Sequence, residues 1–225
     1  MEISDKIFKA YDIRGMYPDQ INEEAALRVG KAIVAYTSAK TVLVGRDVRL
    51  STPKLANALT SGIMSMGANV VDMGEVSTPE FYFALGSHEE YGAGVMITAS
   101  HNPKDDNGFK LEKADVVTIG AGSGMEQIKE LAMNNKFDER EKGNYSQKNF
   151  IDEYISAVLA WAGNPDLSGL RAVVDFSNGM ATVTMPEILD RTKCDWVGLC
   201  VNPDGTFPNH IADPMNEDAR AHASR

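Results

Sequence analysis

The amino-acid sequence predicts an α/β protein: a mixed, mostly parallel sheet with helices on both faces, followed by an incomplete second α/β domain of the same kind. Short β-branched and apolar runs alternate along the chain with amphipathic segments of helical length, the order expected of strand–helix–strand crossovers. Capping residues and prolines stand where several of these helical segments begin. A length of 225 residues allows one large domain or two modest ones.

The first part of the chain holds the more regular alternation. Asn22, followed by two glutamates, is expected to cap a helix. Ser51 or Thr52 is expected to cap the next helix, with a proline in its first turn. The remaining pattern predicts strands over residues 41–45, 69–73 and 93–98 and helices over 79–85 and 125–132. The stretch GAGSG at 120–124 is spaced GxGxG rather than GxGxxG, so it is predicted to be a loop and not a dinucleotide site.

A change of composition divides the chain. Residues 134–149 are polar and expected to be irregular, so we predict a first domain over residues 1–147 and a partial second domain over residues 148–225. The second part is predicted to hold a helix over 150–161, a strand over 171–175, a helix over 182–189, a strand over 196–201 and a last helix capped by Asn216. Two strands and one full helix bury little area, so this second unit is expected to be unfinished.

Charge and cysteine content exclude several classes of function. A net charge of −10 argues against a nucleic-acid partner, which needs a basic surface, but leaves small anions possible as ligands. Cys194 and Cys200 have neither disulfide nor zinc spacing and are predicted to be small buried hydrophobes. The amino terminus lacks a secretory signal and no apolar run could span a bilayer, which predicts a cytoplasmic protein without a membrane partner.

The stretch GVMITASHNPKDDNGFK at 94–110 concentrates hydrogen-bonding chemistry in one connection. Ser100 follows a predicted parallel strand, at the edge where open α/β sheets place their ligands. His101, Asn102 and Lys104 surround it, and Lys110 could return toward it as a positive charge. A serine among amide and cationic donors suits a phosphate. The alternatives are an Asn-Pro turn with a capping serine, and a serine hydrolase, although no GxSxG elbow is present.

Several stretches together resemble one family. They are TASHNP with NGFK, FKAYDIRG at 8–15, GRDVRLS at 45–51, VVDFSNGMA at 173–181 and PDGTFPNH at 203–210. In this order they resemble the α-D-phosphohexomutases, the phosphomannomutase and phosphoglucomutase family. The resemblance implies interconversion of hexose 1-phosphate and hexose 6-phosphate, with mannose, glucose or less readily glucosamine as the sugar. It also implies a phosphoserine, magnesium (Mg²⁺) and a hexose 1,6-bisphosphate intermediate and activator.

The resemblance also implies roles for individual residues. Ser100, His101, Lys110 and Arg14 match catalytic positions, and Tyr11, Arg14, Lys110 and Asn102 match positions that bind the phosphorylated hexose. Ser100 would contact the metal through its phosphate. Structural alternatives remain for most of them. Arg14 could form an ion pair with Asp12 or Asp47, Lys110 could be a solvated strand-end lysine, and His101 and Asn102 could only hold the serine. Arg46 and Arg49 are expected to cap helices or pair at the surface, and His210 to shape a loop.

The sequence departs from the family pattern in its second half. The Asp-Gly-Asp-x-Asp metal loop is absent, as are the loops of the third and fourth domains that bind the sugar and the distal phosphate. We therefore expect the chain to be the N-terminal part of a phosphohexomutase and to be inactive by itself. The alternative is a non-catalytic phosphosugar-binding module. The sequence leaves the oligomeric state open.

Overall fold

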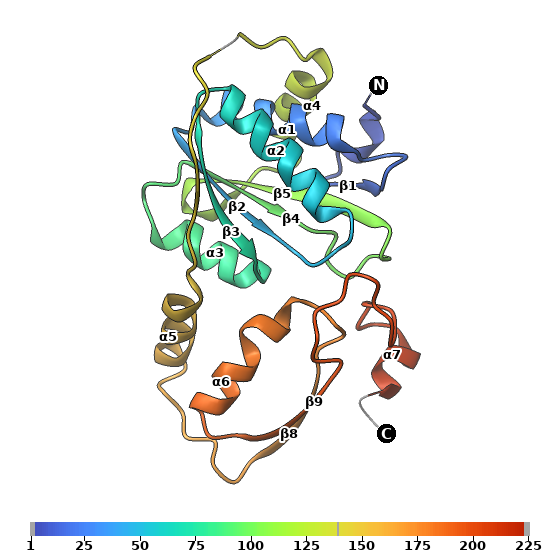
Figure 1. Ribbon diagram of the computed structural model, residues 1–225, viewed down its shortest axis with the longest axis vertical. Helices are drawn as coiled ribbons and strands as arrows, with labels where there is room; N and C mark the ends of the chain where they lie inside the picture. Colours follow the sequence, from blue (N-terminus) through green and yellow to red (C-terminus); the bar gives the residue numbers. More distant parts are fainter. Residues whose placement is uncertain (1–2, 139, 223–225) are drawn as a thin grey trace.

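A seven-stranded mixed sheet lies at the centre of the larger part of the molecule (Figure 1). The computed structural model describes residues 3–138 and 140–222. The strands are β1 (Ile13–Met16), β2 (Thr41–Arg46), β3 (Asn69–Glu75), β4 (Ala93–Ile97), β5 (Asp106–Lys113), β6 (Val117–Thr118) and β7 (Tyr145–Gln147). Their order is β1-β5-β4-β2-β3-β7, with β6 paired to β5. The pairs β4–β2, β2–β3 and β3–β7 are parallel. Strand β5 pairs with β4, β1 and β6 in the antiparallel sense.

Helices cover both faces of this sheet, which confirms the predicted fold class. On one face lie α1 (Glu23–Thr37), α2 (Thr52–Ser65) and α4 (Met125–Asn134), and on the other lies α3 (Thr78–Ser87) (Figure 1). The first face buries the larger apolar cluster, and the α3 face buries a smaller one that includes Phe150, just before α5 (Ile151–Trp161). Within the described ranges, no helix is both long and apolar enough to cross a membrane.

Two of the three predicted helix caps form their hydrogen bonds: Asn22, and Asn216, whose side chain accepts from the Ala219 amide at 3.1 Å; Ser77 is a cap that was not predicted. The Asn22 side chain accepts a hydrogen bond from the Ala25 amide at 3.1 Å, which caps α1. Ser77 caps α3 in the same way. Ser51 occupies the cap position of α2 but makes no capping hydrogen bond, because its hydroxyl accepts from the Asn107 side chain at 2.8 Å.

Four strands of this sheet, β1, β5, β6 and β7, were not predicted from the sequence. Residues 145–147, expected to be irregular, form β7 and pair with β3. The NGFK stretch is not a turn but the interior of β5, where Gly108 lies opposite Arg14 of β1. A Cβ at Gly108 would lie 2.1 Å from the Ile13 carbonyl oxygen, so only glycine allows β1 to approach this closely.

The smaller part of the molecule contains a two-stranded parallel sheet, β8 (Arg171–Asp175) and β9 (Asp195–Leu199). A short 3₁₀ turn and α6 (Met185–Arg191) connect the strands, and α7 (Glu217–His222) lies near the end of the described chain. The prediction that Cys194 and Cys200 are buried is wrong. Both are half-buried, because so small a sheet has few covering elements. The segment after β9 rises toward the loop between β4 and β5 (Figure 1).

Candidate functional site

Ser100 lies at the end of β4 on an exposed loop. The five residues of β4 are all buried, as are Thr98 and Ala99, and the chain reaches the surface at Ser100. Its φ of 56° is left-handed, a conformation uncommon for residues other than glycine. The Ser100 amide donates to the Thr98 hydroxyl at 2.9 Å, which helps to hold this turn. The backbone therefore presents the side chain of residue 100 outward.

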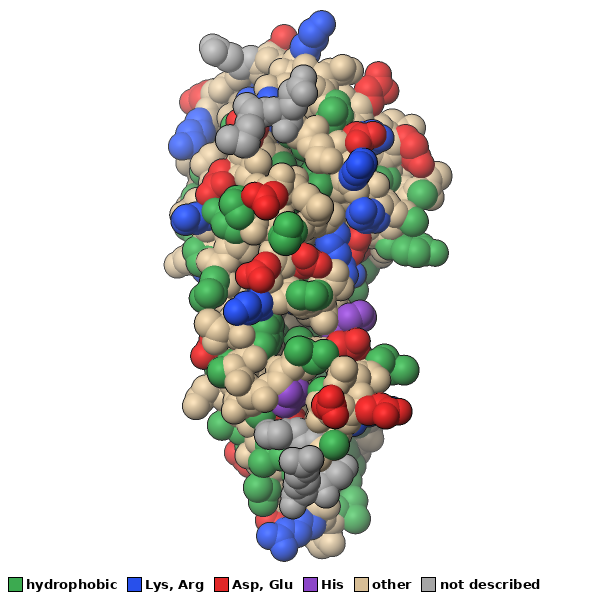
Figure 2. Space-filling view, turned by 90° about the vertical axis from the view of Figure 1, so that its right-hand side faces the viewer, with side chains coloured by type: hydrophobic (Ala, Val, Ile, Leu, Met, Phe, Trp, Pro, Cys, Tyr) green, Lys and Arg blue, Asp and Glu red, His purple; other side chains and the backbone are tan. Residues whose placement is uncertain are grey.

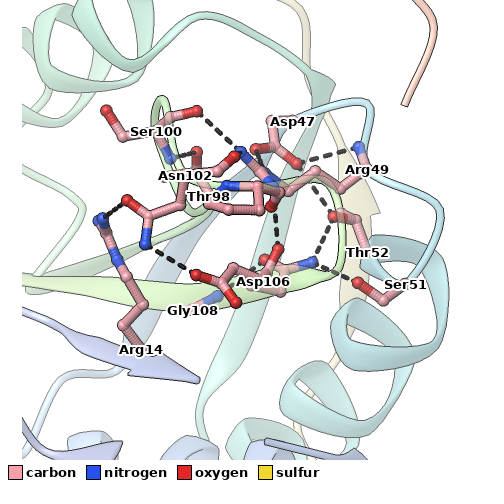
Figure 3. A network of polar contacts seen from close by, with 12 residues as sticks. Arg14, Asp47, Arg49, Ser51, Thr52, Thr98, Ser100, Asn102, Asp106 and Gly108 are labelled. Carbon is pink, nitrogen blue, oxygen red and sulfur yellow. Dashed lines mark hydrogen bonds and ion pairs between the residues drawn. The ribbon is translucent and has the colours of Figure 1, made fainter. Parts of the chain in front are cut away.

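The buried guanidinium of Arg49 fixes the conformation of this loop (Figure 3). Its side chain is 0% exposed. It donates to four backbone carbonyl oxygens of the loop: Ser100 at 2.9 Å, Asn102 at 2.8 Å, Pro103 at 2.6 Å and Asp106 at 3.0 Å. The prediction of helix capping or surface pairing for Arg49 is therefore wrong. The planar fork of arginine satisfies several carbonyls at once, which a lysine ammonium does not.

Asp47 provides the charge that allows this arginine to be buried. The Asp47 carboxylate accepts from Arg49 Nε at 3.1 Å and from the Thr52 hydroxyl at 3.0 Å. Burial lowers the pKa of Arg49, and the negative charge of Asp47 opposes that shift. Asn107 of β5 donates to the side chains of Ser51 and Thr52, at 2.8 and 2.9 Å. The GRDVRLS turn, the serine loop and NGFK therefore form one hydrogen-bonded assembly.

Arg14 of β1 joins this assembly from the other side. Its Nη1 donates to the Asn102 side-chain oxygen at 2.8 Å, and the Asn102 amide nitrogen donates to Asp106 at 2.8 Å (Figure 3). Arg14 also forms the ion pair with Asp12 that the sequence offered as its structural alternative. Its buried Nε has no hydrogen-bond partner within the described part of the chain. The hydrogen bonds of Arg14 therefore fix its guanidinium beside the serine loop and leave one of its donors unsatisfied.

Lys110 shares a sheet face with Arg14. In the antiparallel registers Arg14 lies opposite Gly108, and Lys110 lies opposite Met96. Because opposite residues in an antiparallel pair point to the same side, both cationic side chains lie on the face that carries α3. Glu112, next on that face, is fully buried, which raises its pKa, while the positive charge of Lys110 opposes the shift.

A pocket of about 340 Å³ opens beside Ser100, between the two parts of the molecule. Met96, Thr98, Ser100 and His101 line it from the larger part, together with Asp47, Val48 and Thr78. The smaller part contributes Ser177, Gly179, Met180, Phe207, Ala212 and Pro214. The ring of Phe207 lies 5.4 Å from the Arg49 guanidinium carbon, so the wall formed by the smaller part rests on the residue that holds the serine loop.

Other residues singled out in the sequence lie away from this network. Tyr11 is 79% exposed and is not among the residues that line the described pockets. Arg46 is paired as expected, with both oxygens of Asp72 at 2.6 Å. His210 bonds Asp175 at 3.0 Å, in keeping with a role in shaping its loop. The contact of Phe207 and the role of Arg49 in holding the serine loop were not predicted. The one sequence signal for these two residues was that each lies in a stretch that resembles the family.

The carboxylates around Ser100 do not form a magnesium site. Asp47 is occupied by Arg49 and Thr52, and Asp106 accepts from Asn102. Across residues 3–138 and 140–222, the one group of three or more metal-binding side chains is Asp175, Cys200 and His210. Magnesium prefers oxygen ligands, and Asp47, the one carboxylate among the residues that line this pocket in the described part of the chain, is already bonded to Arg49 and Thr52. The residues present therefore do not complete a Mg²⁺ site.

Comparisons with known proteins agree with this architecture. The family described as phosphoglucomutase/phosphomannomutase, alpha/beta/alpha domain I, matches residues 5–139. A phosphomannomutase of Salmonella montevideo is 37% identical over 221 residues, which cover 95% of this chain and 48% of that protein. A phosphomannomutase/phosphoglucomutase of Pseudomonas syringae pv. tomato is 39% identical over 220 residues, covering 94% and 45%.

A solved structure shows the same fold. The crystal structure of a phosphoglucomutase/phosphomannomutase family protein from Burkholderia thailandensis superposes with a TM-score of 0.89 at 33% identity, and covers 98% of this chain and 49% of that one. The chain spans about half the length of the relatives it matches. On its sequence, fold and domain match, this chain belongs to the phosphoglucomutase/phosphomannomutase family.

Proposed function

We propose that this chain carries the phosphoserine of a phosphohexomutase that interconverts hexose 1-phosphate and hexose 6-phosphate. The observation that carries the proposal is the geometry of Ser100. Its hydroxyl is exposed on a loop whose carbonyls are held by buried Arg49, so a group on that oxygen would be presented to the pocket in a fixed position. Phosphoryl transfer depends largely on such positioning and on compensation of charge.

In the proposed reaction, the phosphorus of the seryl phosphate forms a bond to a free hydroxyl of the hexose monophosphate. Its bond to the Ser100 oxygen breaks, and the proton of the sugar hydroxyl leaves toward a base. The bisphosphorylated sugar then turns round and returns its other phosphate to Ser100. We assign Lys110 and His101 to charge stabilisation and proton transfer.

Substrate binding is assigned to four residues on this side of the sheet. Arg14 and Lys110 supply positive charge on the α3 face. Asn102 links Arg14 to the loop, and Tyr11 lies exposed just before β1. A guanidinium is suited to donate hydrogen bonds to the oxygens of a phosphate.

Magnesium is proposed as the cofactor of the full-length protein only. Because the carboxylates around Ser100 in the described part of this chain are already bonded to neighbouring side chains, we assign no step to the metal here. We keep the division into residues 1–147 and 148–225 as a proposal. We also propose that the chain alone converts mannose 1-phosphate slowly or not at all, even with magnesium and a trace of hexose 1,6-bisphosphate.

The test is phosphorylation of the serine, which does not require turnover. The chain is incubated with mannose or glucose 1,6-bisphosphate, and its intact mass and phosphopeptides are measured. We expect a gain of about 80 Da located at Ser100, retained in Ser87→Ala, which removes another exposed serine, and lost in Ser100→Ala. A gain that persists in Ser100→Ala would refute the proposal. Binding of the bisphosphate without transfer would favour the phosphosugar-binding module, and labelling of Ser100 by a fluorophosphonate would favour a hydrolase.

A further inference from the structure

Three side chains with metal-binding atoms converge at the carboxyl ends of β8 and β9. Asp175 is the last residue of β8, Cys200 directly follows β9, and His210 comes from the segment after it. Their ligand atoms all lie within 4.8 Å of one another. The side chains of Asp175 and His210 are each 11% exposed, and Cys200 is half-buried. The carboxyl ends of parallel strands are also where open α/β sheets place their ligands.

The hydrogen bonds of His210 leave a lone pair aimed at this cluster. Its Nδ1 lies 2.9 Å from the Ile211 carbonyl oxygen, which can only accept, so Nδ1 is the donor in this contact and Nε2 is the nitrogen left to bind a metal when the ring is neutral. Its Nε2 then presents a lone pair to the Asp175 carboxylate oxygen, 3.0 Å away. Two acceptors at this distance need a proton or a metal cation between them. An N–H donated to a backbone carbonyl is the usual way in which a metal-binding histidine is oriented.

Asn178 braces the segments that carry these side chains. It is 4% exposed. Its backbone amide donates to the Cys200 carbonyl at 3.1 Å, and its side chain donates to the Asn202 carbonyl at 2.8 Å. It also accepts from the side chain of Asn209, the neighbour of His210, at 2.8 Å. The Ser177 amide donates to the Asp175 Oδ1 atom at 2.9 Å. These hydrogen bonds therefore fix the segments that carry the three side chains relative to one another.

We propose that Asp175, Cys200 and His210 bind a divalent transition metal of the zinc class, with water in the fourth position. Tetrahedral zinc with bonds of about 2.0–2.2 Å places its nitrogen and oxygen ligands roughly 3.3 Å apart. The separation of 3.0 Å between His210 and Asp175 is close to that value. Sulfur and nitrogen donors select zinc or cobalt over magnesium. The Cys200 thiol loses its proton to solvent on binding, so the metal bonds to a thiolate.

The site adjoins the pocket beside Ser100 but is separate from the proposed phosphoserine chemistry. Ser177, two residues after Asp175, and Phe207 and Ala212, on either side of His210, line that pocket. The proposal does not depend on phosphoryl transfer, and it can stand or fall without any mutase activity.

The experiment titrates the 225-residue chain with Co²⁺ alone under anaerobic conditions and records the thiolate-to-cobalt charge-transfer absorption. We expect one equivalent to bind, Zn²⁺ to displace it, and excess Mg²⁺ to leave it in place. Cys200→Ser should abolish the band, and Cys194→Ser, the matched control at the other cysteine, should retain it. Asp175→Asn and His210→Gln should weaken binding at least tenfold, whereas Ser100→Ala should not change it.

A second measurement guards against variants that fail to fold. Zn²⁺ should raise the thermal unfolding midpoint of the unmodified chain and of Cys194→Ser, but not that of Cys200→Ser. The absence of a charge-transfer band in the unmodified chain would overturn the proposal. A band that survives in Cys200→Ser would also overturn it, as would displacement of bound Co²⁺ by Mg²⁺ as readily as by Zn²⁺.

Discussion

The guanidinium of Arg49 is stacked beneath the ring of Phe207, with 5.4 Å between its central carbon and the ring centre. Arg49 belongs to the larger part of the molecule and holds the serine loop, whereas Phe207 belongs to the smaller part. The two parts therefore meet at the residue on which the position of Ser100 depends.

Replacing Arg49 should destabilise the larger part strongly. Arg49→Lys leaves loop carbonyls unsatisfied, and Arg49→Ala also leaves the buried Asp47 carboxylate without its cation. Breaking a buried ion pair typically costs about 3–5 kcal/mol. We expect a loss of that size in urea unfolding of Arg49→Ala. Arg171→Lys, which alters an ion pair with a 74% exposed arginine, should change stability by less than about 0.5 kcal/mol.

The contact between Arg49 and Phe207 should be measurable as a coupling energy. A double-mutant cycle with Arg49→Gln and Phe207→Leu isolates it from the other bonds of the arginine, because glutamine has no positive charge to face the ring. Cation–π contacts contribute about 0.5–2 kcal/mol, depending on desolvation. We expect a coupling within that range in unfolding free energies. Strict additivity of the two substitutions would contradict a direct energetic link between the two parts.

Gly205 should tolerate no side chain. A Cβ at this position would lie 2.3 Å from the Val48 carbonyl oxygen and 2.9 Å from the Arg49 Cα, both of them backbone atoms. Gly205→Ala should therefore displace the Phe207 segment and speed proteolysis between residues 200 and 214. Gly179→Ala is the control, since its added Cβ meets nothing closer than 3.4 Å. Equal proteolysis rates for the two variants would show that the close approach does not matter.

The buried carboxyl of Glu80 should make stability depend on pH. Glu80 is 2% exposed, and burial raises its pKa to about 7 from an ordinary value of 4.5, opposed by a hydrogen bond from the Ser77 backbone. The folded state then holds a proton that the unfolded state releases, so stability should fall as pH rises from about 4.5 to about 7. The loss attributable to Glu80 should be about 3 kcal/mol.

Glu80→Gln is the matching variant, because it keeps the shape and removes the titration. It should flatten this part of the stability–pH profile and stabilise the protein at pH values above the range in which Glu80 titrates. Glu89→Gln, at an exposed position nearby, should leave the profile unchanged. If the two variants gave the same profile, the buried carboxyl would not be the source of the pH dependence.

The sequence predicted those parts of the fold that local signals determine. The start of α1 follows from Asn22 and the apolar residues after it, because a cap and a helical stripe lie within a few residues. Strands β5 and β7 were missed because most of their own residues are polar and their partners β1 and β3 are distant in sequence. Strand pairing is a non-local interaction, and a polar segment carries no local sequence signal for it.

The site shows the same limit. The resemblance singled out Ser100, Arg14 and Asn102, and the structure bonds Arg14 to Asn102, which lies on the same loop as Ser100. The role of Arg49 was not foreseen, since its four carbonyl partners lie 51 to 57 positions away. The cluster around Cys200 was missed for a similar reason. Its ligands come from three separate segments, so no spacing motif marks them.

The left-handed backbone at Ser100 limits which alcohol can occupy this position. Threonine offers the same hydroxyl, but its branched Cβ makes a φ of 56° a strained outlier. An exchange of serine for threonine, harmless at many surface positions, would here force the loop out of the geometry that Arg49 holds. Of the two aliphatic hydroxyl side chains, the main chain therefore favours the primary alcohol of serine at position 100.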